Sequence, residues 1–597
     1  MNIRWRPLAY AAACILSAGC STHDNTIAPE TAAAPSGAGV ISYTFALQPG
    51  APPRVRVTLR VTGEADGSSR LAIAPDWGGV ENCERFVHDL AVHDAAGHAC
   101  GVVSDAAAPH GWNVSHEPGA ALVASYELRP SPTDPLAAFG THYEPVVRPE
   151  FFQLIGQTGL IYPEWLEDAP AHEVDIRCTW EGFRESGWTV VSSFDGTAGA
   201  RGRTLPDFRH AMFLAAAPGS VRVQDRDIPG GKLRVAIVED DWGFNDTELI
   251  DLVARIVTVE REFVGDFEDP YFLVTVAPTG PRATPQSISM GGTGLTNCFA
   301  LFMAPGTTVA PESAHRRAVL HLLAHEYFHT WNGGKITTAD PEELVYWFSE
   351  GFTDFYAARL LHRAGLVSSA EWLDRTNETL RNLWLSPVAT APAETIRREF
   401  WSRREVQQLP YNRGEVVALM LDEEIRRVSG GRQSLDDFFR ELLREARGGE
   451  KAQTDSLLAR VERWTSRGFA ADLRDIVVDG VLPSPPARTS DPAAVRIDAD
   501  TYRYDPGFDV DTSLQTRIAS GVREGSAAYA AGLRDGQALV GFSVHHGNPD
   551  RQIELKIKEG EQPRSVVYFP RGEPIRMPRY QPNDAPDGAA HQPTPRR

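Results

Sequence analysis

Residues 320–332 of the chain read LHLLAHEYFHTWN, and residues 349–354 read SEGFTD. Residues four apart lie on one face of a helix, so His325 and His329 can both point at one ion. Glu350 follows 21 positions after His329, in an amphipathic segment, and offers a carboxylate from a second helix. Two imidazoles and one carboxylate around an open position are typical ligands of a catalytic zinc ion. The two stretches predict a zinc-dependent peptidase with one Zn²⁺.

Two further acids beside these ligands have predicted roles. Glu326 directly follows the first ligand, from where its carboxylate can reach a zinc-bound water and act as general base. Asp354 lies one helical turn after Glu350 on the same face, and is expected to accept the second N–H of a ligand histidine. His321 and His325 are also four apart, but no glutamate follows His321 at the required spacing. His321 is therefore expected to pack in the core or to contact a metal ligand without binding the metal itself. The alternative is a solvated helix with incidental histidines.

Length and composition limit the class of protein. A chain of 597 residues is too long for one core, so two to four domains are expected. It is 42% hydrophobic and 23% charged, as in ordinary globular proteins. The net charge of -20 argues against a nucleic-acid partner, because neutralising phosphates requires a basic surface.

The N-terminus has the features of a targeting segment. Arg4 and Arg6 precede an apolar stretch from Leu8 to Leu16 that is too short to span a membrane. The following Leu16-Ser17-Ala18-Gly19-Cys20 resembles the lipobox of bacterial lipoproteins. Residues 1–19 are therefore expected to be a signal peptide, with lipid on Cys20 anchoring the protein in the bacterial cell envelope. Ser21 favours the outer membrane, facing the periplasm; the alternative is an ordinary secretory signal.

Hydrophobic periodicity and composition along the chain predict a multidomain α+β protein. Residues 20–39 form a flexible tether, and 40–220 alternate with period two and predict a β-sandwich. Residues 221–485 combine strands near 233–238 and 271–276 with long helical patterns, and fit a two-lobed metallopeptidase domain. The helical patterns cover about 246–263, 313–332, 342–365, 370–384, 412–429, 434–446 and 453–466.

Residues 486–575 return to a β-like pattern that looks like a PDZ domain. Residues 525–536 resemble its short helix and following turn, and residues 506–510 its carboxylate-binding loop. A C-terminal peptide is the ligand that this resemblance implies, although any small β domain could have such glycine-rich turns. Residues 576–597 are rich in proline and are expected to be disordered. Cys83 and Cys100 are close enough in sequence to pair in an exported protein.

The motifs together resemble those of a known family. His-Glu-Tyr-Phe-His-Thr-Trp-Asn at 325–332 and Glu-Gly-Phe-Thr at 350–353 look like the signature of the glycyl aminopeptidase family of gluzincin metallopeptidases. Its members combine an N-terminal β domain, a thermolysin-like catalytic domain and a PDZ domain. The resemblance implies that His325, His329 and Glu350 bind zinc and that Glu326 is the base.

A second matching segment begins at Tyr411. Tyr411-Asn412-Arg413-Gly414 is similar to the Tyr-x-Lys-Gly segment of this family, whose tyrosine hydroxyl binds the oxyanion of the tetrahedral intermediate. The resemblance therefore implies that Tyr411 stabilises the transition state. Its alternative is a tyrosine that only packs in a core.

One segment departs from the family pattern. The family usually has Gly-Gly-Leu-Glu-His at the strand beside the cleft, with the glutamate binding the free amine of the substrate. Here the stretch begins Gly291-Gly292-Thr293, and Gly294 occupies the place of that glutamate. The backbone of Gly291 and Gly292 is expected to pair with an extended substrate. A desolvated ammonium needs an acceptor, so Gly294 leaves an aminopeptidase and an endopeptidase both open.

The predicted function is thus a zinc peptidase of the aminopeptidase type that acts on peptides in the cell envelope. An endopeptidase on the same scaffold is the first alternative. The second is a non-catalytic lipoprotein that recruits partners through its PDZ-like domain. The intact Glu326 argues against it, since loss of catalysis usually removes the base or a ligand.

Overall fold

The computed structural model describes residues 39–583 apart from 49, 51, 105–107, 132, 138–140, 196–202, 281–288, 546 and 560–561. The predicted signal peptide lies outside the described residues, as do the tether up to residue 38 and the tail from 584 onward. The chain forms two compact units. The first holds the chain up to 337 with 356–366 and 442–451, and the second holds 338–355, 367–441 and the chain from 452 onward.

The first unit begins with a β domain that contains three larger sheets, ordered β13-β1-β2-β9-β6, β12-β3-β8-β7 and β10-β11-β15-β14. The period-two alternation is present in β2, where Val55, Val57 and Leu59 are buried between exposed or half-buried neighbours. The strands are β1 (Gly39–Gln48), β2 (Arg54–Thr62), β3 (Ser68–Ala72), β4 (Asp76–Trp77), β5 (Val80–Glu81), β6 (His88–Asp94), β7 (Gly101–Ser104), β8 (Gly111–Ser115), β9 (Ala121–Leu128), β10 (Val146–Val147), β11 (Phe151–Ile155), β12 (Tyr162–Pro163), β13 (Val174–Glu181), β14 (Thr189–Ser192) and β15 (Met212–Ala216), with short helices α1 (Gly156–Gly159) and α2 (Leu205–Arg209).

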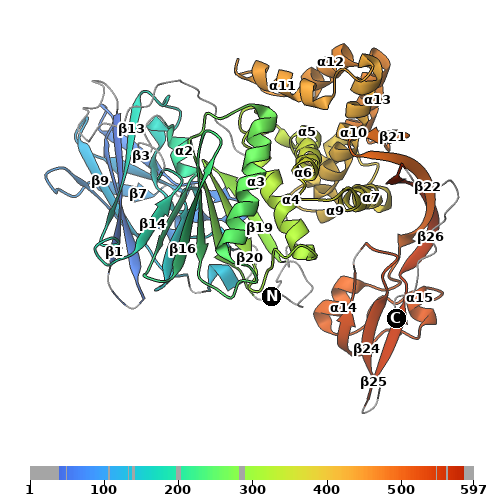
Figure 1. Ribbon diagram of the computed structural model, residues 1–597. Helices are drawn as coiled ribbons and strands as arrows, with labels where there is room; N and C mark the ends of the chain where they lie inside the picture. Colours follow the sequence, from blue (N-terminus) through green and yellow to red (C-terminus); the bar gives the residue numbers. More distant parts are fainter. Residues whose placement is uncertain are drawn as a thin grey trace. The chain divides into compact units, whose positions relative to one another are not determined.

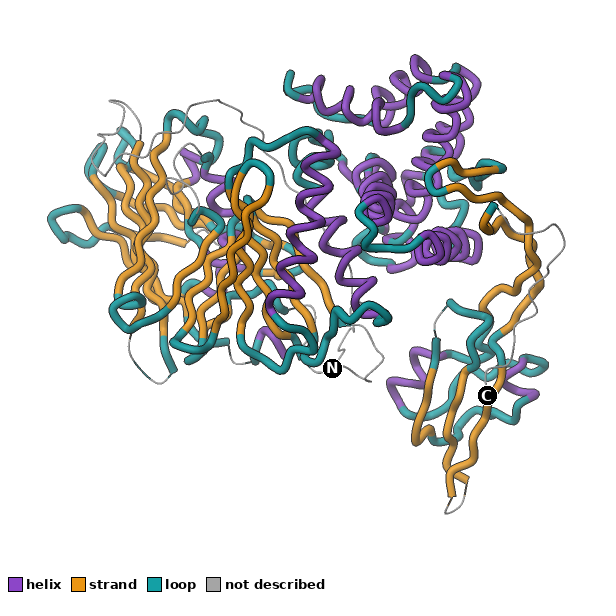
Figure 2. The backbone as a smooth tube through the Cα atoms, viewed as in Figure 1, coloured by secondary structure: helices purple, strands orange, loops and turns teal. Residues whose placement is uncertain are grey.

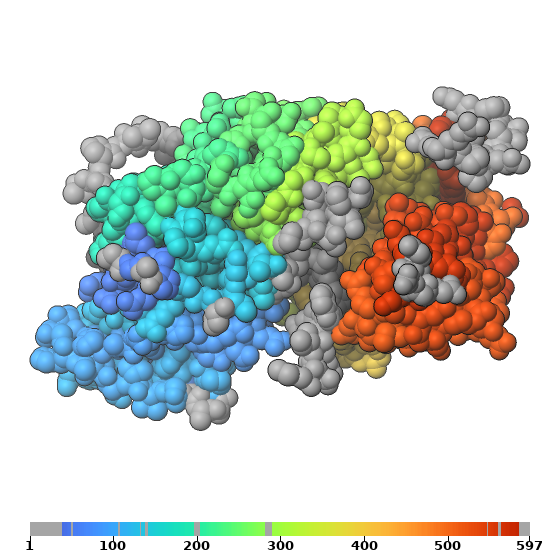
Figure 3. All heavy atoms as spheres, turned by 90° about the horizontal axis from the view of Figure 1, so that it is seen from below, coloured from blue at the N-terminus to red at the C-terminus, as the bar shows by residue number. Residues whose placement is uncertain are grey.

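A mixed five-stranded sheet follows in the same unit, in the order β16-β17-β18-β20-β19 (Figure 1). Strands β17, β18 and β20 run parallel, while β16 and β19 are antiparallel edges. One hydrophobic core includes residues of this sheet and of the preceding β domain, and Figure 3 shows the blue-to-cyan and green residues adjoining. The elements are β16 (Val221–Ile228), β17 (Gly231–Val238), α3 (Asp246–Val264), β18 (Tyr271–Pro278), β19 (Met290–Leu295), β20 (Cys298–Met303) and α4 (Ala314–Phe328).

The second unit contains a helical region, drawn in purple in Figure 2. Its longer helices agree closely with the predicted helical patterns. The sequence did not indicate α8, α9 and α13, whose patterns are short or begin close to a preceding helix. Two helices, α6 and α11, contain residues of both units. The helices are α5 (Tyr346–Ser349), α6 (Gly351–Arg363), α7 (Ser369–Leu385), α8 (Ala393–Glu399), α9 (Arg404–Gln407), α10 (Leu409–Ser429), α11 (Leu435–Ala446), α12 (Thr454–Trp464) and α13 (Arg467–Val477).

The chain ends in a small β domain with its own hydrophobic core, which contains residues of the sheet β23-β24-β25. Ile553, Leu555 and Ile557 of β24 are buried at every second position, and Leu533 packs in the same core. The elements of this region are β21 (Arg488–Ser490), β22 (Ala493–Tyr504), α14 (Val510–Thr516), α15 (Ala527–Ala530), β23 (Leu539–Ser543), β24 (Ile553–Glu559), β25 (Gln562–Tyr568) and β26 (Arg571–Pro582).

Two expectations about this region can be compared with the structure. The predicted short helix and turn at 525–536 correspond to α15 and to Gly532, whose φ of 94° favours a residue without a Cβ. The predicted carboxylate-binding loop at 506–510 leads into helix α14. The PDZ-like domain stays a prediction.

The expectation of a disordered tail from residue 576 is wrong for residues 576–582, which belong to β26. Tyr580 is buried, its hydroxyl donates to the carbonyl of Pro486 at 2.7 Å, and its N–H donates to Asn377 Oδ1 at 2.7 Å. Pairing with β22 stabilises a segment whose proline content alone indicated disorder.

The four cysteines in the described part of the chain are free thiols, so Cys83 and Cys100, which are close enough in sequence to pair, form no disulfide in the structure. Cys83 is fully buried, and Cys100 is half-buried. Among the described residues, no helix combines the length and the apolar character that crossing a bilayer requires.

Candidate metal centre

Helix α4 and the residue after it present the two predicted histidine ligands. The Ser313 side chain accepts a hydrogen bond from the His315 N–H and caps the start of this helix. The Nε2 atoms of His325 and His329 lie 3.0 Å apart, and both residues are buried. Two nitrogens bound to one tetrahedral zinc ion at about 2.0–2.1 Å would be about 3.3 Å apart. The pair is therefore spaced for a shared ion.

The orientation of His329 is set by its other ring nitrogen. Nδ1 lies 2.8 Å from the carbonyl oxygen of Asn332, to which it donates. This hydrogen bond places the ring proton on Nδ1 and leaves the lone pair of Nε2 for a metal. Asn332 was not identified from the sequence, since the contact uses its backbone and needs no particular side chain.

Glu350 completes the predicted ligand set. Its carboxylate oxygen and the ring nitrogens of His325 and His329 all lie within 4.8 Å of one another. Only 2% of Glu350 is exposed, and a buried carboxylate is costly unless it is paired or binds a metal. Two nitrogen donors and one oxygen donor at this spacing fit a zinc ion.

Aromatic packing holds the helix that follows Glu350. Tyr356 of α6 stacks on Phe328 of α4 with ring centroids 4.9 Å apart, and it contacts Phe263 of α3 at 5.1 Å. These three residues belong to one unit. Glu350 directly precedes α6, so the stack fixes the helix whose start carries the third ligand.

Glycine at 351 and 414 permits a close approach next to this ligand. A Cβ on Gly351 would lie 2.3 Å from the Cα of Gly414, and a Cβ on Gly414 would lie 2.0 Å from the carbonyl oxygen of Trp347. Both distances are far below van der Waals contact. The backbone of α10 therefore packs directly against the segment that contains Glu350.

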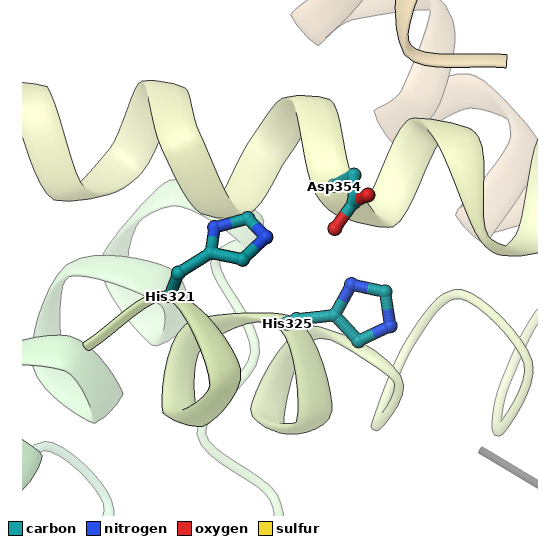
Figure 4. A group of neighbouring side chains, drawn as sticks. All are labelled: His321, His325 and Asp354. Atoms are coloured by element: carbon teal, nitrogen blue, oxygen red, sulfur yellow. The ribbon is translucent and has the colours of Figure 1, made fainter. Parts of the chain in front are cut away.

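Asp354 groups with two histidines of α4. Its carboxylate and the ring nitrogens of His321 and His325 lie within 4.8 Å of one another, and Figure 4 shows both rings beside the carboxylate. Asp354 also forms an ion pair with Arg375 of α7 at 3.4 Å. Arg375 in turn lies 3.2 Å from Glu415. His321 thus belongs to the group of side chains around Asp354. Arg375 belongs to no sequence motif, so only the structure identified it.

The predicted base is held by the edge of the five-stranded sheet. Glu326 is 4% exposed, and its Oε2 accepts a hydrogen bond from the backbone N–H of Gly294 at 3.1 Å. A Cβ on Gly294 would lie 3.6 Å from the same oxygen. An acid at position 294 would therefore place a second carboxylate next to the base, whereas glycine adds no charge there.

The predicted substrate strand is β19. Gly291 lies opposite Phe302 of β20 in the ladder, and the carbonyl of Gly292 accepts a hydrogen bond from the Tyr143 hydroxyl at 2.7 Å. Burial raises the pKa of Tyr143, and the nearby charge of Glu326 raises it further. Tyr143 comes from the N-terminal β domain and has no motif, so only the folded chain reveals it. The role of Gly291 and Gly292 in substrate binding stays a prediction.

Tyr411 lies in the first turn of α10 and is 7% exposed. Gly414, one turn later on the same helix, contacts the segment next to Glu350. Arg413 is buried, its Nη2 donates to the carbonyls of Ala389 and Ala391, and burial lowers its pKa to about 10. The oxyanion role of Tyr411 stays a prediction.

Comparison with known proteins agrees with this geometry. Residues 318–393, which contain both histidines, Glu350 and Asp354, match the family described as M61 glycyl aminopeptidase. This match supports a peptidase of the gluzincin type. The fold of the chain is similar to that of an aminopeptidase N family protein from Idiomarina loihiensis, at 14% identity, with a TM-score of 0.65 over 91% of this chain and 98% of that chain.

Other solved structures have lower TM-scores against this chain. The M1 zinc metallopeptidase of Deinococcus radiodurans has 18% identity and a TM-score of 0.45, over 76% of this chain and 97% of that chain. A mutant of that enzyme bound to a Tyr-Ser-Ala substrate gives the same TM-score of 0.45, at 18% identity over 75% of this chain and 95% of that chain. No curated protein sequence matches the chain.

Proposed function

We propose that the chain is a zinc-dependent aminopeptidase that hydrolyses peptides with water. The grouping of His325, His329 and Glu350 within 4.8 Å, with the carboxylate of Glu326 held beside β19, is the observation that carries this proposal. A bound zinc ion would lower the pKa of a water ligand to about 7 and polarise the scissile carbonyl. One such ion is proposed.

The side chains of this chain then have distinct tasks. Glu326 accepts a proton from the attacking water on its carboxylate and passes it to the nitrogen of the leaving amine. The N–H of Gly294 orients that carboxylate. The hydroxyl of Tyr411 donates a hydrogen bond to the oxygen that becomes negative in the transition state. Asp354 accepts the second N–H of His325 and keeps its ring oriented.

Zinc content and hydrolysis measured together test the proposal. Purified protein should contain about one zinc per chain, and a chelator should remove both the metal and the activity. Glu326→Gln should keep the zinc and lose the hydrolysis. Hydrolysis by this variant at the wild-type rate would contradict the assigned base.

An endopeptidase is the second candidate, and Gly294 is the observation that favours it. Position 294 offers no carboxylate to hold a substrate ammonium. Peptides with free and acetylated N-termini distinguish the two activities. An aminopeptidase cuts the free form preferentially, whereas equal rates on both forms identify an endopeptidase.

We further propose that the protein is a lipoprotein of the bacterial cell envelope, anchored in the outer membrane through Cys20 and facing the periplasm. The sequence around Cys20 supports this proposal. Labelling with a fatty-acid analogue should modify the full chain and not its Cys20→Ala variant.

We also propose that the PDZ-like domain binds a peptide C-terminus. Binding of a fluorescent peptide with a free C-terminus, compared with the same peptide with an amidated C-terminus, tests this proposal.

A further inference from the structure

Two groups from outside the sheet contact the edge strand β19 on the same side. The Tyr143 hydroxyl donates to the carbonyl of Gly292 at 2.7 Å, and the N–H of Gly294 donates to Glu326 at 3.1 Å. In an antiparallel strand, residues two apart direct their backbone groups to the same edge. Strand β20 pairs with the other edge, so both contacts lie on the edge of β19 that pairs with no strand in the described part of the chain, which is called the free edge below.

A free edge is where an extended peptide can pair as an additional strand. Glu326, the proposed base, marks the position of the reacting bond on this edge. With a rise of about 3.4 Å per residue, the contacts at Gly292 and Gly294 are about 7 Å apart along the strand. An extended peptide therefore has room for about two residues between Glu326 and Tyr143.

Tyr143 is packed too tightly to move aside. It is 6% exposed, and its ring contacts Trp77 at 5.5 Å and Phe302 at 5.6 Å between centroids. His142 packs against the same ring at 4.1 Å. A Cβ on Gly78 would lie 2.9 Å from the Tyr143 ring, so the turn after β4 also borders the ring. Moving the ring would break these contacts and leave a buried hydroxyl without its partner.

We propose that Tyr143 determines specificity by closing one end of the substrate groove about two residues from the scissile bond. A substrate chain that continues past this point meets the ring, so one product of each cleavage is a short terminal fragment. This inference rests on the proposed peptidase function. It explains how the N-terminal β domain can restrict cleavage to chain ends although position 294 has no acid to bind the amine.

The test uses the full-length, zinc-loaded protein with a decapeptide and a tripeptide. Mass spectrometry identifies the first products of the decapeptide, which for the wild type should include a fragment of one to three residues from one terminus. Cuts farther from both ends should be slower than the terminal cut by a factor of about 10. Tyr143→Ala should raise the share of these internal cuts by about 10-fold. The tripeptide has no internal position of this kind, so its cleavage reports hydrolysis alone.

Two control variants distinguish the loss of the Tyr143 ring from the loss of its hydroxyl and from a general effect of removing a buried tyrosine. Tyr143→Phe keeps the ring and should keep the wild-type pattern of products. Tyr162→Ala removes another tyrosine of the β domain with a similar exposure of 7%, which packs against the Arg209 guanidinium, and should also keep the pattern. Zinc content and melting temperature are measured for each variant.

Several outcomes would overturn the inference. One is a wild-type enzyme that first cuts the decapeptide in its middle, which needs no variant to observe. Another is a folded, zinc-loaded Tyr143→Ala with an unchanged pattern of products. A zinc-loaded wild type that hydrolyses neither peptide would instead contradict the proposed function, and this inference with it.

Discussion

Replacing Asp354 by asparagine should weaken zinc binding while leaving the fold intact. The carboxylate lies within 4.8 Å of the ring nitrogens of His321 and His325, and its side chain is 13% exposed. Asparagine has nearly the same shape but no charge, so it holds the ring of His325 less strongly. Loss of such a partner typically costs about 10–100-fold in metal affinity, or about 1.4–2.7 kcal/mol.

The surrounding contacts confine this effect to the metal centre. Arg375 lies 3.4 Å from Asp354 and 3.2 Å from Glu415, so the guanidinium keeps a charged partner in the variant. The free energy of unfolding of the metal-free protein should therefore change little. Arg375→Gln should weaken zinc binding less than Asp354→Asn, because it removes a support of Asp354 and leaves the carboxylate in place.

Competition with a chromophoric chelator of known zinc affinity measures the dissociation constant for each variant. Asp374→Asn serves as the matched control, since Asp374 is an exposed aspartate of α7. Its zinc affinity should equal that of the wild type. A wild-type zinc affinity in Asp354→Asn would refute the argument that this carboxylate supports the ligands.

Four further predictions concern the site and its support. Glu326→Gln should lower kcat by a factor of about 10²–10⁴ with zinc retained, as measured by peptide hydrolysis and metal analysis. Tyr411→Phe should lower kcat about 10²–10³-fold with little change in KM, and a change confined to KM would argue against an oxyanion role. Gly414→Ala should cost about 1–3 kcal/mol of stability, seen as a lower melting temperature, because its Cβ meets the Trp347 carbonyl at 2.0 Å. Burial raises the pKa of Glu342 to about 7 from its ordinary 4.5, so the folded state holds this proton more tightly than the unfolded chain. Its contribution to stability is therefore lost as the pH rises from 4.5 to about 7, and Glu342→Gln should remove this part of the pH dependence in denaturant titrations.

Local sequence patterns identified the cluster of possible ligands and most of the helices. His325 and His329 are four apart at the end of one helix, so the helix geometry alone brings their rings together. The apolar periodicity of α3, α7 and α10 likewise identified helices that the structure contains. These features depend on residues within a few turns of one another, which is the range over which sequence patterns are informative.

The tail shows where such patterns fail. The proline-rich composition after residue 576 indicated disorder, yet β26 extends to Pro582 by pairing with β22 about 80 residues earlier in the chain. The stabilising partner is distant in sequence, and composition carries no information about it. The free thiols of Cys83 and Cys100 have a similar cause, because proximity in sequence does not set their distance in the fold.

By itself, the sequence indicated that His325 and His329 can share a metal and that Glu326 can act as base, because their spacing follows from one turn of helix. Only the tertiary structure decided what surrounds them: Gly294 and Tyr143 at the edge of β19, and Arg375 behind Asp354. Those contacts join residues between 21 and 149 positions apart, such as Tyr143 and Gly292. Packing and backbone hydrogen bonds bring them together, and neither leaves a motif in the chain.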